Sequence, residues 1–272
     1  MPRDYKNSPS VKKTGLRLDN RDLTREWVEK YPHAAHIWNN WQFQHLDPQS
    51  VDHLLALFND SHMHYDRERD PGPHGEPSLA DMTEKALEIL SRNEEGYFLM
   101  VEGGRIDHAH HDGNAYHALH EGVALNHAVA RALELTDAKE TLILVTADHS
   151  HTLSFAGYPT RGNPILGKVI GNDKHGNPKT ILELADDGKP YAALGYYTSP
   201  TAMGKDGRRD LTNIDTEISS FYQQAAILFH VGRHGGEDVA IYANGPGAGR
   251  VHGVMEQNEI YNVIFQALWP DK

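Results

Sequence analysis

Four segments of the chain carry apolar residues at the three- and four-residue spacing of an amphipathic helix, namely 21–30, 78–92, 108–135 and 256–268. Ser78 and Asp81 form the S-x-x-D pattern of a capping box at the start of the second segment. Short apolar runs predict strands at 36–38, 96–100, 140–147 and 239–243, and 53–58 is a further apolar segment. This alternation is typical of an α/β fold, and the segments between 96 and 147 predict one right-handed βαβ unit.

Two stretches lack this regular pattern. Residues 1–18 are polar and predict a loop-like start. Between 157 and 229, turn-forming Gly, Pro, Asp and Lys residues separate short apolar runs, which indicates a smaller insertion with little regular structure. The chain has 272 residues, of which 39% are hydrophobic, so a sizeable core with one appended insertion is feasible.

The stretch that leads into helix 108–135 concentrates acidic and imidazole side chains. It reads VEGGRIDHAHH and contains Glu102, Asp107 and His111. At about 100° per residue, Asp107 and His111 fall on the apolar side of the helix, and their i, i+4 spacing points both toward one site. The opposite side carries histidines that we expect to be solvated: His110, His117, His120 and His127.

These carboxylates also have simpler explanations. Asp107 could be a first-turn carboxylate that the helix dipole favours, with His111 as an incidental neighbour. Glu102 could be an ordinary strand-end carboxylate, or it could bind a hard, oxygen-preferring cation such as Mg²⁺. The spacing of Asp107 and His111 suits Zn²⁺, which takes nitrogen and oxygen ligands.

A second group of candidate ligands follows the strand 140–147. Asp148 and His149 end this strand, and His151 lies two residues further on. They could bind a second metal ion, or form a helix N-cap followed by a surface histidine. His234, alone, would be structural or exposed. Because open α/β sheets place their sites beyond the strand ends, these groups together predict a two-metal phosphoryl-transfer centre, with metals about 3.5–4 Å apart.

Composition narrows the partners and the metal chemistry. The net charge of −12 disfavours nucleic acid or an anionic membrane as the main partner. The chain has no Cys but 19 His, so any zinc site must use imidazoles and carboxylates. No apolar run approaches transmembrane length, and the first residues lack the apolar core of a signal peptide.

Long motifs of this chain resemble the alkaline phosphatases. They are VEGGRIDHAHH, TADHSH with the following FAGYPTRGNPILG, HGGEDVAIYANGP and HGVMEQN, preceded by LRLDNRDLTREWVEKYP, LFNDSHMHY and PSLADMTEKALEIL. The resemblance extends from about residue 15 to 269 and is weakest over 169–229. It implies an α/β core with a mostly parallel sheet flanked by helices, incomplete here, over 1–168 and 230–272. Residues 169–229 fall on the crown-like insertion of the family.

The resemblance also implies a phosphomonoesterase with two zinc ions and one magnesium ion. The matching positions are Glu102 for magnesium, Asp107, His111 and His234 for the first zinc, Asp148 and His149 for the second, and His108 and His151 for groups near the phosphate or behind the ligands. The family further implies a homodimer, phosphate monoesters as substrates and a periplasmic or extracellular, cell-surface location. Asn59 stands where a calcium-binding Glu is usual, so we expect no calcium site.

One departure from the family is serious. The family's nucleophile is a serine in a D-S-A-G/A-T-A-like motif, and this motif does not occur in the sequence. The family's bridging Asp, Ser/Thr magnesium ligand and phosphate-clamping Arg are also unmatched. We therefore expect the C-terminal portion of an alkaline phosphatase, inactive in isolation. The alternatives are a non-catalytic metal-binding fragment, or another metal phosphoesterase or sulfatase of the same superfamily.

Overall fold

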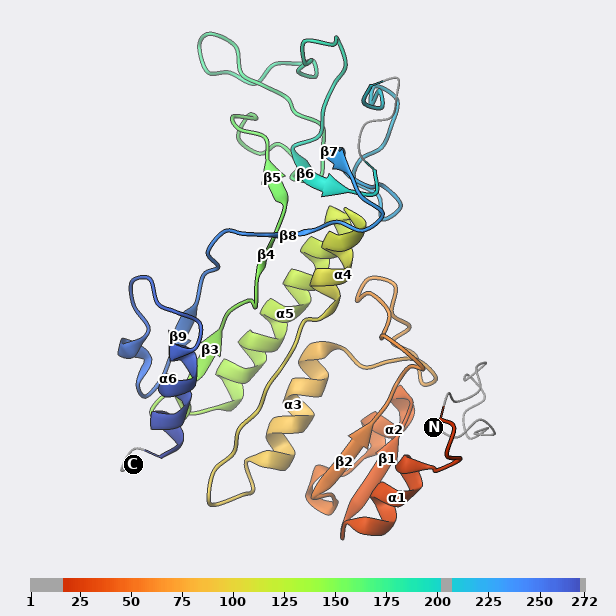
Figure 1. Ribbon diagram of the computed structural model, residues 1–272, viewed down its shortest axis with the longest axis vertical. Coiled ribbons are helices and arrows are strands. Elements are labelled where there is room, and N and C mark those ends of the chain that lie inside the picture. Colours follow the sequence, from red (N-terminus) through yellow and green to blue (C-terminus); the bar gives the residue numbers. More distant parts are fainter. Residues whose placement is uncertain (1–16, 202–206, 270–272) are drawn as a thin grey trace. The chain divides into compact units, whose positions relative to one another are not determined.

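The computed structural model describes residues 17–201 and 207–269. Most of the predicted loop-like start lies outside these ranges. The chain divides into two compact units (Figure 1). Unit 1 comprises Met1–Glu102, Ala124–Ile143 and Ala243–Lys272, and unit 2 comprises Gly103–Val123 and Leu144–Tyr242. Helices and short strands alternate in both, which confirms the predicted α/β class.

Unit 1 begins with helices around a two-stranded parallel sheet, in which β1 pairs with β2. Its elements are α1 (Leu23–Lys30), β1 (Ala34–Ile37), α2 (Asn40–His45), η1 (Pro48–Ser50), β2 (His53–Ala56), α3 (Leu79–Leu90) and α6 (Glu259–Leu268). Leu87 of α3 and Val263 of α6 are buried, as their helical spacing predicts. The helical and strand segments predicted for this region therefore form close to their expected bounds.

Helix α3 starts with the predicted capping box. The Ser78 side chain accepts a hydrogen bond from the Asp81 N–H, and the Asp81 carboxylate accepts one from the Ser78 N–H. We expect Ser78→Ala to lower the unfolding free energy of unit 1 by about 1 kcal/mol. The Asp81 N–H loses its acceptor, and the reciprocal hydrogen bond from the Ser78 N–H to Asp81 is weakened. Urea unfolding checks this value. The matched control is Ser91→Ala at the exposed end of α3, and equal losses in both variants would contradict the role of the cap.

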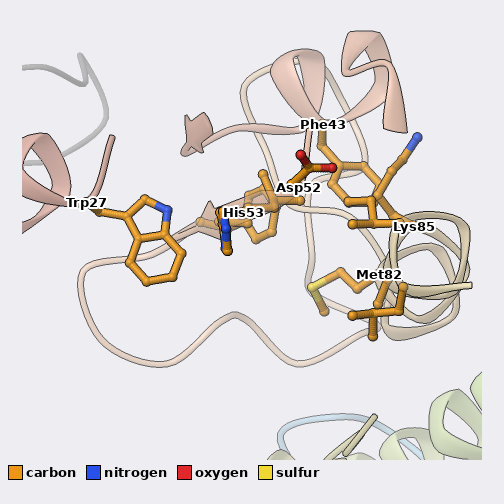
Figure 2. A pocket seen from close by; sticks show the side chains of 12 residues that line it. Trp27, Phe43, Asp52, His53, Met82 and Lys85 are labelled. Carbon is orange, nitrogen blue, oxygen red and sulfur yellow. The ribbon is translucent and has the colours of Figure 1, made fainter. Parts of the chain in front are cut away.

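A pocket of unit 1 lies between the sheet and α3, with a cavity volume of about 380 Å³ (Figure 2). Its lining is mostly apolar and includes Trp27, Phe43 and Met82. Among its polar residues, Asp52 pairs with Arg92, at 3.0 Å from Nη2 to Oδ1. The pocket therefore brings no group of histidines and carboxylates together, in contrast to the site in unit 2.

Histidine 36 makes the stability of unit 1 sensitive to acid. It lies on β1, its Nε2 is buried without a hydrogen-bond partner, and burial lowers its pKa below the usual 6.5. The pKa of His36 is lower in the folded protein than in the unfolded chain. The stability that comes from burying the neutral ring is therefore fully present above about pH 6.5 and is lost as the pH falls toward the pKa of the folded state. We therefore expect His36→Leu to remove part of the acid destabilisation.

Tryptophan fluorescence measures this effect in unit 1 alone, because Trp27, Trp38, Trp41 and Trp269 all belong to it. Urea midpoints of the wild type and the variant are compared at about pH 7.5 and about pH 5. The control is a leucine substitution of the exposed His74. A pH dependence of His36→Leu identical to that of the wild type would contradict the prediction.

Unit 2 is built on α4 (Arg105–Asp112) and the first part of α5 (Ala115–Leu135). Its strands are β4 (Ser150–His151), β5 (Leu153–Phe155), β6 (Leu194–Ser199), β7 (Ala225–Leu228) and β8 (His234–Gly235). Strand β6 is the centre of a three-stranded sheet, antiparallel to β5 and parallel to β7. A buried cluster of Ala115, Leu194, Tyr196 and Ala225 joins this sheet to α5.

Two short strands and one turn complete the described chain. Strand β3 (Ile143–Val145) pairs with β9 (Tyr242–Asn244), and η2 (Ala248–Arg250) follows. The sheets among the described residues have two or three strands each, and they include parallel, antiparallel and mixed pairings. The mostly parallel sheet and the boundaries of the insertion therefore stay predictions. No helix in the described ranges combines the length and apolar character needed to cross a membrane.

Four predicted elements differ from the structure, one of them the strand 239–243, which forms only at Tyr242–Asn244 as β9. Residues 96–100 do not form a strand, and Phe98 and Met100 are 61% and 74% exposed. A strand needs a neighbour for its backbone groups, and the described residues pair none with this segment. The predicted βαβ unit was therefore wrong in its first strand. The single helix over 108–135 was also wrong, because Gly113 adopts a left-handed conformation (φ 73°) that ends α4.

Candidate metal centre

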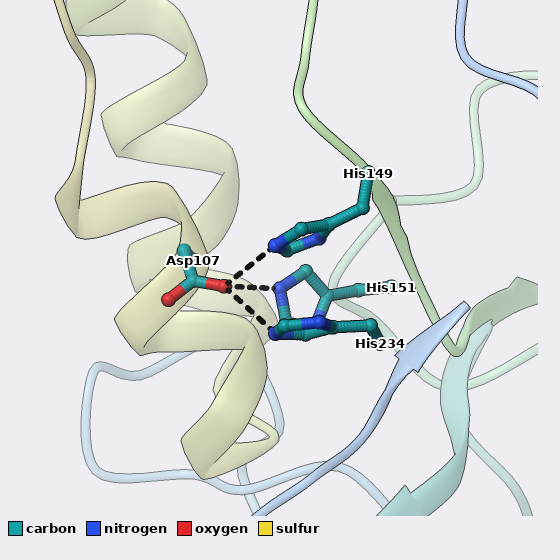
Figure 3. Close-up of side chains that lie close together, drawn as sticks. All are labelled: Asp107, His149, His151 and His234. Atoms are coloured by element: carbon teal, nitrogen blue, oxygen red, sulfur yellow. Dashed lines mark hydrogen bonds and ion pairs between the residues drawn. The ribbon is translucent and has the colours of Figure 1, made fainter. Parts of the chain in front are cut away.

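Two local features of unit 2 bring its histidines to one carboxylate. Helix α4 carries Asp107 and His111 one turn apart, so both side chains leave the same face. Strands β4 and β8 pair antiparallel with His151 opposite His234. His149 directly precedes β4. Figure 3 shows the imidazoles of His149, His151 and His234 around the Asp107 carboxylate.

One carboxylate oxygen lies at the centre of this group, which we call the Asp107 cluster: Asp107, His111, His149, His151 and His234. Asp107 Oδ1 lies 2.6 Å from His151 Nε2, 3.3 Å from His111 Nε2, 3.8 Å from His234 Nε2 and 3.9 Å from His149 Nε2. Asp107 is 37% exposed at its side chain, whereas His151 is 6% exposed. The cluster is thus open to solvent on one side and buried on the other.

Backbone carbonyls fix the orientation of two of the rings. His111 Nδ1 donates to the Gly232 carbonyl over 2.6 Å, and His149 Nδ1 donates to the Ser150 carbonyl over 3.2 Å. A neutral imidazole that donates from Nδ1 keeps a lone pair on Nε2. Metal-binding histidines are typically oriented in this way, by a hydrogen bond from the ring nitrogen that does not bind the metal.

Gly232 lies close against the end of α4. Its N–H donates to the His111 carbonyl over 2.7 Å, while its own carbonyl accepts from the His111 ring. A Cβ at this position would lie 3.0 Å from the His111 carbonyl oxygen and 3.1 Å from that of His110. The absence of a side chain therefore allows the loop before β8 to hold His111 on both its backbone and its ring.

The surroundings of Asp107 favour an ionised carboxylate. Burial by itself would raise the pKa of Asp107, but the hydrogen bond from His151 and the nearby imidazoles bring this pKa below its usual value. Burial lowers the pKa of His151, against the opposing effect of Asp107. An ionised carboxylate is the form in which an aspartate binds metals.

The donor set fits zinc. Zn²⁺ is bound in proteins by imidazole nitrogen and carboxylate oxygen, and the Nε2 atoms of His111 and His234 face each other at only 3.2 Å. Two lone pairs at this distance repel unless a proton or a cation lies with them. His149 and His234 also stack, with ring centroids 3.6 Å apart and an interplanar angle of 16°. The rings therefore present several nitrogens and one oxygen to one small region.

The remaining predicted site residues lie outside the Asp107 cluster. Asp148 is 86% exposed at its side chain, and its Oδ2 lies 3.4 Å from His149 Nε2. His108 is half-buried on α4, and its Nδ1 accepts from Arg105 over 3.3 Å. Glu102 is exposed and belongs to unit 1. Its magnesium-binding role stays a prediction.

Two histidines that we expected to be solvated are not. His117 is only 6% exposed. His110 packs between other rings, and burial lowers its pKa to about 4. Helical phasing failed for His110 because α4 ends at Gly113, so the apolar side of α5 does not determine which side of α4 is buried. His127 is exposed, as predicted.

Sequence reasoning also missed the partner of His110. Tyr196 Oη lies 2.7 Å from His110 Nδ1, and 86 residues separate the two. Burial raises the pKa of Tyr196, so the phenol stays protonated. The sequence placed Tyr196 in a segment with little regular structure and gave no sign that its hydroxyl reaches α4.

The fold and the Asp107 cluster together define an α/β protein with a histidine–carboxylate site of metal-binding type. The chain belongs to the alkaline phosphatase family, whose model matches residues 1–269. It is 41% identical to the tissue-nonspecific alkaline phosphatase of Rattus norvegicus over 260 residues, which cover 94% of this chain and 47% of the relative. It is also 41% identical to the alkaline phosphatase of Gadus morhua over 267 residues, covering 97% of this chain and 53% of the relative.

One solved structure supports the fold. The structure of a TAB5 alkaline phosphatase mutant with bound magnesium is similar over 93% of this chain and 56% of its own, with a TM-score of 0.57 and 20% identity. The chain spans about half the length of the curated relatives it matches. Family membership thus stands on sequence, and the similarity to the TAB5 enzyme supports the fold alone.

Proposed function

We propose that this chain provides metal ligands for the hydrolysis of phosphate monoesters by an alkaline phosphatase. The single observation that carries this proposal is the convergence of Asp107, His111, His149 and His234 within one cluster, in a chain 41% identical to named alkaline phosphatases. The resemblance alone assigns residues by position. The cluster adds that these side chains, up to 127 positions apart in the sequence (107 to 234), face one another.

In this proposal the metals are two zinc ions and one magnesium ion. The proposed ligands are Asp107, His111 and His234 for the first zinc, Asp148 and His149 for the second, and Glu102 for magnesium. Bound metal would supply positive charge that stabilises the entering and leaving oxygens of phosphoryl transfer. Asp107 lies close to imidazoles assigned to both zinc ions, 3.3 Å from His111 and 3.9 Å from His149.

The protein's own groups prepare this site for an anionic substrate. His151 donates its Nε2–H to Asp107 and so holds the carboxylate in one orientation. His108 and His151 are the proposed groups near the phosphate or behind the ligands. The chain carries a net charge of −12, so attraction of a phosphate ester has to come from charge bound locally at the site.

The complete enzyme requires parts that this sequence does not match. The proposed nucleophile is a serine, which would form a phosphoserine intermediate that water then hydrolyses. We propose that it comes from a D-S-A-G/A-T-A-like motif in the half of the relatives that this chain does not match. We also propose the mostly parallel sheet, a crown-like insertion over 169–229, a homodimer and a periplasmic or extracellular, cell-surface location for the complete enzyme.

A fusion protein tests this function. The unmatched part of the Rattus norvegicus relative is placed ahead of this chain, and p-nitrophenyl phosphate hydrolysis is measured at alkaline pH with Zn²⁺ and Mg²⁺. We expect turnover that falls by at least about 100-fold in His234→Ala, because a metal ligand is lost. His175→Ala, at an exposed turn of unit 2, is the matched control and should retain the activity. A folded, zinc-loaded fusion without turnover would contradict the proposal.

A second candidate function is a non-catalytic metal-binding fragment. The observation that favours it is the missing serine motif. The fusion assay separates the two candidates, because zinc binding without turnover is expected of the isolated chain in either case. Turnover by the isolated chain that His234→Ala abolishes would refute the fragment and would also show that the serine motif is dispensable.

A further inference from the structure

We propose that Tyr196 and His110 are positioning residues for the Asp107 cluster, in that they hold the ring of His151 and, through it, the carboxylate of Asp107. This inference rests on the proposed metal-dependent function, because its effect is on metal binding. The three side chains come from three elements, β6, α4 and β4, and form a continuous row from the core of unit 2 to the cluster.

Tyr196 is the fixed end of this row. It is 4% exposed and belongs to the buried cluster with Ala115, Leu194 and Ala225. It lies on the central strand of its sheet, where it is opposite Leu153 of β5 and Ala225 of β7. With neighbours on both sides, this residue has little freedom to move, so its hydroxyl offers a stationary hydrogen-bond partner.

His110 transmits this position to the cluster. Its Nδ1 lies 2.7 Å from Tyr196 Oη, and its ring meets the Tyr196 ring edge-on, with centroids 5.8 Å apart. On the other side it packs nearly parallel to His151, with centroids 4.9 Å apart and an interplanar angle of 23°. The hydrogen bond sets the rotation of His110, and the stacked face then sets the plane available to His151.

His151 depends on this packing because one of its nitrogens has no hydrogen bond. The side chain is 6% exposed, and its Nδ1 is buried without a partner among the described residues. Its Nε2 donates to Asp107 Oδ1 over 2.6 Å. A buried histidine is normally oriented through both nitrogens. Here the stacked ring of His110 takes the place of the second hydrogen bond.

The consequence concerns the direction of the Asp107 carboxylate. The same oxygen that accepts from His151 is the one nearest to His111, His149 and His234. If His151 tilts, the Asp107 carboxylate turns, and the donor atoms no longer point toward one metal position. Loss of a group that orients a metal ligand typically costs about 10–100-fold in metal affinity. A role that was only structural would lower stability without changing the affinity of the folded protein.

The variant Tyr196→Phe tests the row with the smallest possible change. It removes one oxygen and keeps the ring, and we expect zinc affinity of the isolated chain to fall by about 10-fold in competition with a chromophoric chelator. Tyr197→Phe is the matched control, because the neighbouring Tyr197 is 59% exposed and successive residues of a strand face opposite sides. Its affinity should equal that of the wild type.

The second readout is the nitrogen NMR spectrum of the His151 ring. In the zinc-free wild type we expect one tautomer, with the proton on Nε2 facing Asp107. In Tyr196→Phe the ring nitrogens should move toward averaged shifts. A second variant, His110→Gln, retains a polar group for Tyr196 but removes the stacked face, and should have the same two effects even if Tyr196→Phe fails to fold.

The outcomes separate this inference from the function it rests on. A wild-type chain that binds no zinc contradicts the proposed function. A wild type that binds zinc, with affinity and His151 tautomer unchanged in both Tyr196→Phe and His110→Gln, overturns the inference alone. Equal weakening by Tyr196→Phe and Tyr197→Phe also overturns it, because the effect would then not depend on the hydroxyl that reaches His110.

Discussion

Replacing Asp107 with asparagine is expected to weaken zinc binding by at least about 100-fold, the largest effect of any single substitution in the cluster. Asp107 supplies the one carboxylate of the Asp107 cluster, and all four imidazoles lie within 4 Å of its Oδ1 atom. Asparagine has the same shape but neither the negative charge nor two equivalent oxygens. Loss of this central donor should therefore exceed the effect of losing an orienting partner.

Competition with a chromophoric chelator measures the affinity, and circular dichroism confirms that the variant is folded. The matched control is Asp112→Asn, which changes the same residue type at the exposed end of the same helix. This control should bind zinc like the wild type. A folded Asp107→Asn variant with wild-type affinity would show that zinc binds elsewhere in the chain.

The substitution Gly113→Ala is expected to destabilise unit 2 by about 2–4 kcal/mol. Gly113 has a φ of 73°, and an added Cβ would overlap the Ser199 hydroxyl and lie 3.0 Å from the Ser199 Cβ. Ser199 is fully buried at the end of β6, so it has no room to withdraw. Backbone strain and overpacking would both destabilise the structure at Gly113, which ends α4 two residues after His111.

Hydrogen exchange of the amides in α4 measures this loss within unit 2, where tryptophan fluorescence reports nothing. The control is Gly122→Ala, in the middle of α5, where a Cβ would meet no atom within 4 Å. Alanine favours a helix over glycine by up to about 1 kcal/mol, so this variant should be slightly more stable. Similar exchange in Gly113→Ala and the wild type would contradict the assigned role of Gly113.

Local sequence patterns predicted the parts of the structure that depend on contacts between residues close together in the sequence. The capping box at Ser78 and Asp81 formed, because both partners lie within one helical turn. The i, i+4 spacing of Asp107 and His111 put the two side chains on one face of α4, with Asp107 Oδ1 and His111 Nε2 3.3 Å apart. These features need only the geometry of a helix, which the sequence determines by itself.

Features that depend on tertiary contacts were not predictable in this way. The apolar run 96–100 has the composition of a buried strand, but a strand forms only where a neighbouring strand satisfies its backbone. The burial of His110 depends on Tyr196, which arrives from β6 and has no local signal near α4. A helix projection drawn through Gly113 then assigned His110 to the solvent, since it treated α4 and α5 as one helix.

The candidate site itself lies between these two cases. The resemblance to alkaline phosphatases singled out its histidines by motif, and the pairing of β4 with β8 explains why His151 and His234 meet across 83 positions (151 to 234). No sequence motif predicts that these side chains share one central atom. Four imidazoles surround one oxygen of Asp107, so ligands proposed for two zinc ions lie within reach of the same carboxylate.

X-ray absorption spectroscopy of the zinc-loaded chain tests the claim that the Asp107 cluster is a metal centre most directly. We expect a zinc shell of nitrogen and oxygen at about 2.0–2.2 Å, with the multiple scattering of imidazole rings, because the chain has no cysteine and the cluster is rich in histidine. The imidazole signal should weaken in His234→Ala. Zinc that fails to bind at saturation, or that binds with no imidazole in its shell, would contradict the account.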